Sequence, residues 1–381
     1  MTNTKETQKN SFNSIAIGIR KINTKSGLGK IVLEQAKYCI KHGISLDIYT
    51  HKADNNIKKL AVSIVKIFKI PFLNNYYQRY MFSKIFDYKI KNKKYDIVIG
   101  HGDIVNQDIM FLHNLAEKTH LMTHNKKIDK KNSVTRFHRL VLKKQTFKKI
   151  VANSKLMKKE LEETFFVPND KIKVIYPGYN KKQFNTENIV AKKINAQKSL
   201  GINKNDITIG FITSGDFEKR NLDMFIESVY ILKKEKFEFK ILIIGKNSQL
   251  SQYLYKISKY KLEHMTIVKP LVDDIENYYH GVDFTIHCAY FEEFGMVVLE
   301  AMACGLPVIT SRQVGASEII NKQISVMPKP NIEDIVFNMR QLIVDKKQRQ
   351  KEAELSVNAV KNRSWESYIK EVFSLISKVN E

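Results

Sequence analysis

The sequence predicts an α/β protein of two domains, each a doubly wound parallel sheet with helices on both faces, facing a central cleft. Three observations lead to this prediction. The chain has 381 residues, which is too long for one ordinary domain and enough for two. Short apolar segments alternate with amphipathic segments in both halves, as strands and helices do in parallel sheets. A polar stretch at residues 185–205 interrupts this alternation near the middle of the chain.

The first half alternates strands and helices from its start. Residues 27–43 have helical periodicity and end at Gly43, a residue type that often stops a helix. The other apolar segments are short enough to be buried strands. These predicted strands are residues 14–19, 45–50, 95–100, 148–154 and 171–178.

The second half repeats the pattern and ends in an amphipathic helix, residues 364–379, which carries the single tryptophan, Trp365. Strands are predicted at residues 207–213, 239–245, 266–272, 284–289 and 306–310, and helices at residues 222–234, 275–282 and about 294–303. We therefore expect a first domain at residues 1–178, a linker at 179–205 and a second domain at 206–360. Ligands of such sheets bind beyond the carboxyl ends of the strands, so the cleft is the expected site.

The composition, with 43% hydrophobic and 27% charged residues, is ordinary for a globular protein. No apolar run approaches the roughly 18 residues that a membrane span needs. The polar N-terminus predicts no signal peptide. The three cysteines, Cys39, Cys288 and Cys304, are scattered through mostly apolar segments, which predicts buried thiols in a reducing cytosol and argues against disulfides or a zinc site.

The net charge of +25 lies almost entirely in the first half of the chain. Residues 1–178 hold 35 basic and 14 acidic side chains, whereas the rest of the chain holds 29 and 25. Residues 58–94 combine ten basic side chains with one acid and eight aromatics: Phe68, Phe72, Tyr76, Tyr77, Tyr80, Phe82, Phe86 and Tyr88. Such a surface attracts a polyanion, and an anionic bilayer or a phosphorylated glycolipid fits it. A solvated face enriched in lysine by genome composition is the alternative, and no nucleic-acid-binding module is recognisable.

Two carboxylates flank the start of one predicted helix, in the stretch FEEFGMVVLEAMACGLPVIT at residues 291–310. Glu292 precedes the helix, and Glu300 lies about 12 Å further along it at 1.5 Å per residue. The helix N-terminus between them suits an anion, and each carboxylate can accept hydrogen bonds from paired hydroxyls. The spacing suits a nucleotide-sugar, with sugar, pyrophosphate and ribose in a row. Taken alone, it also suits a loop acid and a solvated helix residue.

The whole string resembles the signature of the family-4 retaining glycosyltransferases of GT-B fold. In that family Glu-x7-Glu is followed by Ala-Met-Ala-Cys-Gly-x-Pro-Val, which residues 292–309 match nearly throughout, with Glu293 where glycine is usual. Order and lengths are most similar to lipopolysaccharide core glycosyltransferases. The resemblance implies that residues 361–381 form a helix crossing back to the first domain. Other segments that resemble family elements are residues 25–50, 174–184 and 213–228.

By this resemblance the second domain binds the donor. Glu292 would contact hydroxyls of the donor sugar, and Glu300 those of the ribose. Lys219 and Arg220 would neutralise the leaving pyrophosphate, although the family's order of the two cations is swapped and its glycine is Asn221 here. The alternative is a solvated helix start, but cations are disfavoured there unless an anion binds. Backbone groups would supply the other donor contacts, at Phe294, Gly295, Met296 and, near the base, Val272.

In the first domain the resemblance implies contacts with the sugar and the acceptor. Gly27 and Gly29 would allow their loop to approach the sugar and phosphate closely, although an ordinary turn would use the same pair. His113 falls where many members place a histidine near the donor sugar, and a core position is its alternative. Asp108 is a candidate carboxylate on the acceptor side. His101 follows a strand and would equally line the cleft.

The implied activity is that of a retaining, metal-independent hexosyltransferase without a cofactor, with UDP-glucose as the default nucleotide-sugar donor. The basic first half favours an acceptor in the cell envelope, a glycan or glycolipid such as lipopolysaccharide core. It also favours a cytoplasmic protein attached peripherally to the inner face of the cell membrane. A transferase with a soluble acceptor and a non-catalytic sugar-nucleotide-binding membrane scaffold are the alternatives. The acids at residues 273–276 have no His or Cys cluster beside them, so no metal site is expected.

Overall fold

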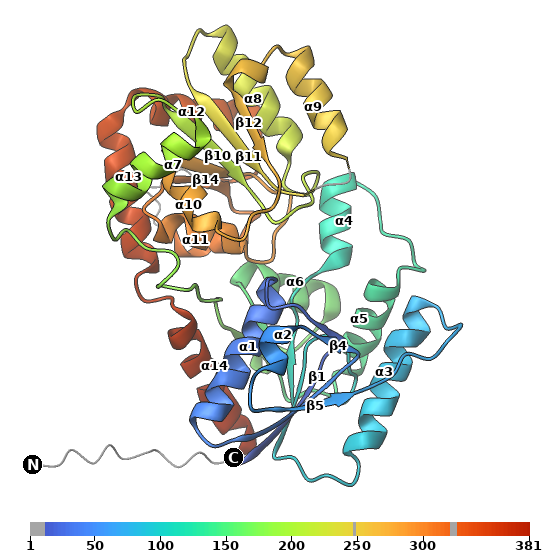
Figure 1. Cartoon of the computed structure of the whole chain (residues 1–381). Helices are drawn as coiled ribbons and strands as arrows, with labels where there is room; N and C mark the ends of the chain where they lie inside the picture. The colour runs from blue at the N-terminus through green and yellow to red at the C-terminus, as the bar shows by residue number, and fades with distance from the viewer. Residues whose placement is uncertain (1–11, 247–248, 321–325) are drawn as a thin grey trace, which may run out of the picture. The chain divides into compact units, whose positions relative to one another are not determined.

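The computed structural model describes residues 12–246, 249–320 and 326–381, so the first 11 residues of the polar N-terminus lie outside it (Figure 1). The chain divides into two compact units. Unit 1 contains the described residues up to Ala116, together with Ile128–Tyr176 and Trp365–Glu381. Unit 2 contains Glu117–Lys127 and Pro177–Ser364.

Unit 1 is built on a seven-stranded parallel sheet in the order β5-β3-β1-β6-β7-β8-β9. Its strands are β1 (Ser14–Gly18), β3 (Ser45–Thr50), β5 (Ser63–Lys66), β6 (Ile97–Gly100), β7 (Ile109–Phe111), β8 (Lys149–Ala152) and β9 (Ile172–Val174). A separate small ladder pairs β2 (Lys21–Ile22) with β4 (Lys52–Ala53). The order reverses at β1, which pairs with β3 on one side and β6 on the other. Ligands of doubly wound sheets bind at such a reversal.

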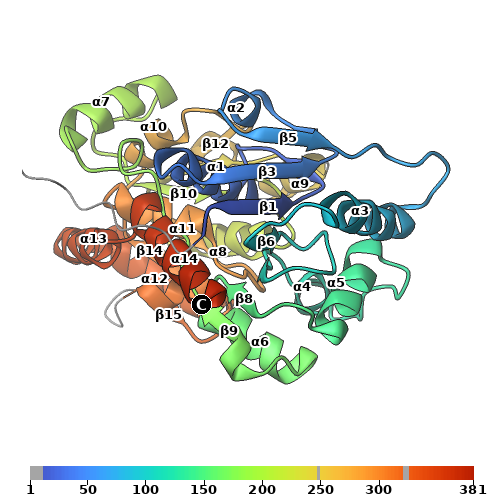
Figure 2. The same cartoon turned by 90° about the horizontal axis from the view of Figure 1, so that it is seen from below.

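The helices of unit 1 are α1 (Gly27–Lys41), α2 (Asn55–Lys58), α3 (Asn75–Ile90), α5 (Ser133–Lys144), α6 (Lys155–Phe165) and α14 (Trp365–Asn380). Side chains cap several of their N-termini, as Ser26 does by accepting a hydrogen bond from the Gly29 N–H. Helices α3 and α5 lie side by side (Figures 1 and 2). The last helix, α14, packs on α1, where Phe373 stacks on Tyr38 with 3.8 Å between ring centroids.

Unit 2 is built on a six-stranded parallel sheet in the order β12-β11-β10-β13-β14-β15. Its strands are β10 (Thr208–Ile212), β11 (Lys240–Ile244), β12 (Thr266–Lys269), β13 (Phe284–His287), β14 (Val308–Ser311) and β15 (Val326–Met327). Its helices are α4 (Ala116–His124), α7 (Ile189–Leu200), α8 (Leu222–Lys234), α9 (Leu250–Lys259), α10 (Ile275–His280), α11 (Met296–Ala303), α12 (Ile332–Val344) and α13 (Lys346–Val360). The order reverses at β10, which pairs with β11 and β13. The prediction of two doubly wound parallel sheets is confirmed.

The structure differs from the prediction in the polar middle of the chain. Residues 179–205, expected as a linker, contain helix α7, which packs against α10. Only Ala196, Gln197 and Leu200 are buried, and three lysines and one asparagine interrupt the apolar pattern of this helix in the sequence. Among the described residues, no helix is both long enough and apolar enough to cross a membrane.

Candidate active site

Two loops of unit 2 meet because they follow neighbouring strands. The loop after β10 carries Lys219 and Arg220, and the loop after β13 carries Glu292. The Tyr290 N–H donates to the Lys219 carbonyl at 3.1 Å and joins the two loops. In the first loop, the Asp216 carboxylate accepts from the Lys219 N–H at 3.0 Å. These backbone contacts fix the direction in which both cations leave the main chain.

The side chains of these loops form an ion cluster of two cations and two carboxylates, here called the Lys219–Glu292 cluster. Arg220 Nη2 lies 3.2 Å from Glu292 Oε2, and Lys219 Nζ lies 3.6 Å from Glu292 Oε1. Lys219 Nζ also lies 3.3 Å from Oε2 of Glu293, the residue that replaces the family's glycine. All four side chains are mostly buried, with exposed fractions of 5% to 16%. Charges that are mostly buried interact strongly with one another, and they favour a ligand that supplies the polar contacts they lack.

The Glu292 carboxylate is ionised and incompletely satisfied. Burial would raise the pKa of the Glu292 carboxyl, but the attraction of Arg220 and Lys219 outweighs burial and holds that pKa below its ordinary value. The backbone of Glu292 is pinned by its N–H, which donates to the Gln313 carbonyl at 2.9 Å. Within the described part of the chain, its buried Oε2 and the buried Nε of Arg220 make no hydrogen bond. Buried polar atoms are rarely left this way, so they make this place a candidate site for a polar ligand.

His287, at the end of β13, is a further member of this site that the sequence analysis did not include. Its Nε2 lies 3.9 Å from Glu292 Oε2 and makes no hydrogen bond with any described residue. Burial lowers the pKa of His287 to about 4, against the opposite effect of Glu292, so the ring is neutral at pH 7. The neutral ring can donate or accept one hydrogen bond at a bound hydroxyl.

The backbone beside the cluster is shaped by Gly295, which precedes α11 with φ of 95°. A Cβ at this position would lie 2.9 Å from Cγ1 of Val314, so both the conformation and the space require glycine. No described side chain caps the helix, which leaves the N-terminal N–H groups around Met296 without a side-chain acceptor. Phe294 is buried and its carbonyl accepts from Ala316 N at 2.7 Å.

The two remaining donor candidates of unit 2 lie outside these two loops. Glu300 is in the second turn of α11 and is buried beside Tyr279, whose pKa is raised well above its ordinary value by burial and then by this carboxylate. Val272 is in the loop after β12, the edge strand of the sheet, and is partly buried. Both stay predictions as ribose and base contacts.

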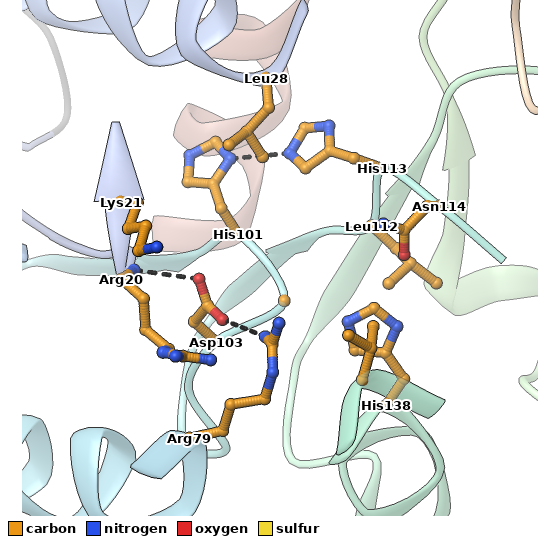
Figure 3. A pocket seen from close by; sticks show the side chains of 12 residues that line it. Arg20, Lys21, Leu28, Arg79, His101, Asp103, Leu112, His113, Asn114 and His138 are labelled. Atoms are coloured by element: carbon orange, nitrogen blue, oxygen red, sulfur yellow. Dashed lines mark hydrogen bonds and ion pairs between the residues drawn. The ribbon is translucent and has the colours of Figure 1, made fainter. Parts of the chain in front are cut away.

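Unit 1 has its own cavity, of about 260 Å³, at the carboxyl ends of β1, β6 and β7. We call it the histidine cavity, because three histidines line it (Figure 3). His101 and Asp103 follow β6, and His113 follows β7, so neighbouring strands deliver them together. The other charged or imidazole side chains of the wall are Arg20, Lys21, Arg79 and His138.

Two of the histidines form a relay. His101 Nε2 lies 3.0 Å from Gln35 Oε1, which can only accept, so we assign the hydrogen of His101 to Nε2. His101 Nδ1 then accepts from His113 Nε2 at 2.9 Å, as Figure 3 shows. Burial lowers the pKa of His113 to about 3, so its ring is neutral and its Nδ1 is left as an acceptor. The structure thus brings His101 and His113 together at the wall of one cavity.

Leu28, which lies between the two glycines at the start of α1, lines the same cavity. Gly29 has a packing reason: its Cβ would lie 1.9 Å from the Asn23 carbonyl oxygen. Gly27 is the first residue of α1 and is partly buried. The loop before α1 therefore packs so closely against this helix that only glycine fits at residue 29.

Asp108, expected as a carboxylate on the acceptor side, lies away from the histidine cavity, and its acceptor role stays a prediction. This residue precedes β7, whereas His113 follows the same strand, so the two lie at opposite edges of the parallel sheet. One Asp108 carboxylate oxygen accepts from the Val98 N–H at 2.8 Å, and the other lies 3.3 Å from Lys148 Nζ. Asp108 thus ties strand starts together and does not reach the histidine cavity.

Sequence reasoning missed Arg20, Arg79, His138 and His287. Arg20 and His287 each stand at the carboxyl end of a central strand, a position that could have singled them out. Arg79 and His138 come from α3 and α5, and no local spacing connects them to the strand ends. Within the described ranges, no three His, Cys, Asp or Glu side chains are grouped so that they could hold a metal ion.

Comparison with known proteins connects both halves of the chain to one group of enzymes. The sequence profile described as Glycosyltransferase Family 4 matches residues 25–183, and the profile described as Glycosyl transferases group 1 matches residues 192–359. The curated sequence "Uncharacterized glycosyltransferase MJ1607" of Methanocaldococcus jannaschii is 30% identical over 226 residues, which cover 58% of this chain and 56% of that protein. The chain thus spans a little more than half the length of the first curated relatives it matches.

Solved structures agree over nearly the whole chain. WaaG, a glycosyltransferase involved in lipopolysaccharide biosynthesis, superimposes with a TM-score of 0.80 at 17% identity and covers 95% of this chain and 99% of its own. Anabaena HepE in complex with UDP and glucose gives a TM-score of 0.76 at 13% identity and covers 96% and 100%. Because the sequence identities are this low, the superpositions show only the fold, which is GT-B. With a family 4 region in its first half and a group 1 region in its second, the chain belongs to the glycosyltransferases of GT-B fold.

Proposed function

We propose that the protein transfers a hexose, by default glucose from UDP-glucose, from a nucleotide-sugar to a cell-envelope glycan or glycolipid. The observation that carries this proposal is the Lys219–Glu292 cluster, in which two mostly buried cations and unsatisfied polar atoms converge at strand ends. Fixed cations stabilise the charge that develops on a departing diphosphate. The names of two structural neighbours, one tied to lipopolysaccharide biosynthesis and one bound to UDP and glucose, support the choice of acceptor and donor.

In the proposed reaction, the bond between the anomeric carbon and the donor phosphate breaks, and its electron pair leaves with the nucleoside diphosphate. An acceptor hydroxyl oxygen bonds to the same face of the anomeric carbon, and its proton passes to the departing phosphate. Lys219 and Arg220 hold the diphosphate, and Glu292 accepts hydrogen bonds from sugar hydroxyls. Glu300 would hold the ribose. We propose that the two cations take the role that a metal ion has in other transferases.

A donor panel tests this proposal. The chain is incubated with nucleotide-sugars that differ in base and sugar, and the release of free nucleotide is measured with chelator present. We expect release from one donor above all others, with UDP-glucose the first candidate, and an increase when acceptor is added. Binding of a donor without release would instead support a non-catalytic scaffold. Release that requires a divalent metal would contradict the role given to the cations.

We also propose that unit 1 attaches to the anionic inner face of the cell membrane. Several aromatics of residues 58–94 are exposed, as Phe68, Phe72 and Tyr88 are, and Lys66 Nζ lies 4.8 Å from the Phe68 ring centre. Others are not available to a membrane, since Phe82 and Phe86 are buried in the core of unit 1. The exposed basic and aromatic side chains suit the interface of an anionic bilayer.

Sedimentation with vesicles checks the membrane proposal. We expect the chain to sediment with vesicles rich in phosphatidylglycerol and to remain largely in the supernatant with phosphatidylcholine vesicles. Because the attraction is electrostatic, raising the salt concentration from 50 mM to 500 mM would release most of the bound protein from the vesicles. Replacing Phe68 and Phe72 by serine would weaken binding several-fold through the loss of apolar burial. Equal, salt-insensitive binding to both vesicle types would rule out the electrostatic attachment.

A further inference from the structure

The charges around the histidine cavity do not balance. Its wall carries three fixed cations, Arg20, Lys21 and Arg79, against one carboxylate, Asp103. The histidines do not add to this positive charge, because burial keeps their pKa values low and their rings neutral at pH 7. Burial lowers the pKa of His138, for example, to about 4. A cavity with two excess positive charges is unfavourable while empty and favourable once an anion enters it.

The single carboxylate is already engaged. Asp103 Oδ1 lies 2.6 Å from Arg79 Nη1, and its Oδ2 accepts from the backbone N–H of Arg20 at 2.9 Å (Figure 3). Asp103 therefore orients Arg79 and holds the Arg20 main chain in place. It forms no ion pair with the Arg20 guanidinium in the described structure.

The side chain of Arg20 has no partner of its own. Within the described residues, its guanidinium makes no hydrogen bond or ion pair, and its Nε is buried, as is the unsatisfied Nε of Arg79. Burial, and then the nearby charge of Arg79, lower the pKa of Arg20, and Asp103 offsets only part of this effect. The guanidinium stays charged at pH 7 in any case. A partly buried guanidinium without a counter-ion costs stability, and such a cost is usual where a residue serves a ligand.

The geometry suits one class of ligand. Two guanidinium groups and an ammonium lie around a cavity large enough for a small anion, and guanidinium matches the oxygens of a phosphoryl group in pairs. We propose that the histidine cavity is an anion subsite that binds a phosphoryl group of the sugar acceptor through Arg20, Lys21 and Arg79. The inference rests on the proposed transferase function, and it narrows the acceptor class to phosphorylated glycans, glycolipids or sugars. His113 Nδ1, the free end of the histidine relay, would accept a hydrogen bond from a hydroxyl of the same ligand.

Direct binding of inorganic phosphate to the full chain tests this subsite. We expect the wild type to bind phosphate by isothermal titration calorimetry. Arg20→Met and Arg79→Met should each weaken binding by about 10- to 100-fold, the loss expected for a charge-assisted hydrogen-bonding group. Arg79→Lys, which keeps the positive charge, should retain part of the phosphate affinity that Arg79→Met loses. The matched control is Lys84→Met, which removes an exposed cation from the same helix as Arg79 and should leave the affinity unchanged.

Thermal unfolding separates a binding role from a folding role. Arg20→Met removes an unpaired, partly buried charge, so we expect this variant to be at least as stable as the wild type without phosphate. Arg79→Met leaves Asp103 without its ion pair and should be less stable, which makes Arg20→Met the sharper variant. If Arg20→Met were less stable and bound phosphate as the wild type does, Arg20 would be a structural residue and the subsite would be refuted.

The donor cluster is the competing location for phosphate, and Arg220→Met distinguishes the two. Phosphate affinity that falls in Arg220→Met and persists in Arg20→Met would place the ion at the donor cluster and overturn the inference, as would no binding by the wild type. Because this measurement needs no donor and no turnover, its failure leaves the transferase proposal to the donor panel. Competition by glucose 6-phosphate assigns the subsite to a soluble sugar phosphate, whereas competition by phosphatidylglycerol vesicles assigns it to a lipid-borne phosphate.

Discussion

Replacing both Lys219 and Arg220 by methionine should lower kcat/KM for nucleotide-sugar turnover by at least about a thousandfold. Each cation approaches the carboxylates of the cluster within 3.2 to 3.6 Å, and each would exchange this contact for a diphosphate oxygen. Removal of one preorganised charge-stabilising group typically costs about a hundred- to a thousandfold in rate, and the two groups act together. Steady-state nucleotide release with the best donor of the panel measures the effect.

The control for this pair is Lys234→Met, which removes an exposed cation from α8, the helix that follows the same loop. It should leave kcat/KM within about twofold of the wild type, as expected for a surface charge. Since the double variant leaves two carboxylates buried without their cations, its circular dichroism and melting must be checked first. A folded double variant with nearly wild-type kcat/KM would contradict the assignment of the leaving-group site.

Replacing Glu292 by glutamine should lower kcat by about a hundredfold or more, while the affinity for free nucleoside diphosphate stays the same or increases. The carboxylate that would hold the sugar also lies 3.2 Å from Arg220 in the free protein, where it competes with the diphosphate for this cation. Loss of the charge thus removes a transition-state contact and a competitor at once. Single-turnover kinetics and calorimetric titration of the diphosphate separate these effects.

Glu293→Gln is the matched control for Glu292→Gln. Glu293 is more buried than Glu292 and lies 3.3 Å from Lys219, but it stands where the family signature has glycine. We expect its replacement to change kcat less than tenfold. An equal loss in both variants would mean that the rate depends on the charge of the cluster as a whole and would refute a specific sugar contact by Glu292.

Much of the fold was predictable because apolar strands and amphipathic helices leave a periodic trace. The strands that escaped prediction are short: β5 and β7 have four and three residues, and β2, β4 and β15 have two each. Helix α7 escaped because few of its side chains are buried. The length and composition of these elements were too weak a signal, and tertiary packing decides their structure.

The candidate site divides in the same way. Glu292 belongs to a local motif with informative spacing, so the residue pattern and the family resemblance both predict it as a site residue. Arg20, Arg79 and His287 come from separate elements that the sheet order brings to a common edge. Their convergence depends on topology, which no local window contains. Asp108 is the reverse case. It precedes strand β7, whereas His113 follows this strand, so Asp108 lies at the opposite end of β7 from the histidine cavity.

If the Lys219–Glu292 cluster holds the diphosphate of a nucleotide-sugar, a free nucleoside diphosphate should bind there through both cations. Calorimetric titration of the nucleoside diphosphate from the best donor into the wild type and the Lys219→Met/Arg220→Met variant, both in chelator, measures this binding. We expect binding by the wild type without added metal and an affinity at least about a hundredfold weaker in the variant, as for the loss of two charged contacts. Equal affinity in the two folded proteins, or no binding by the wild type until a divalent metal is added, would contradict this role of the cluster.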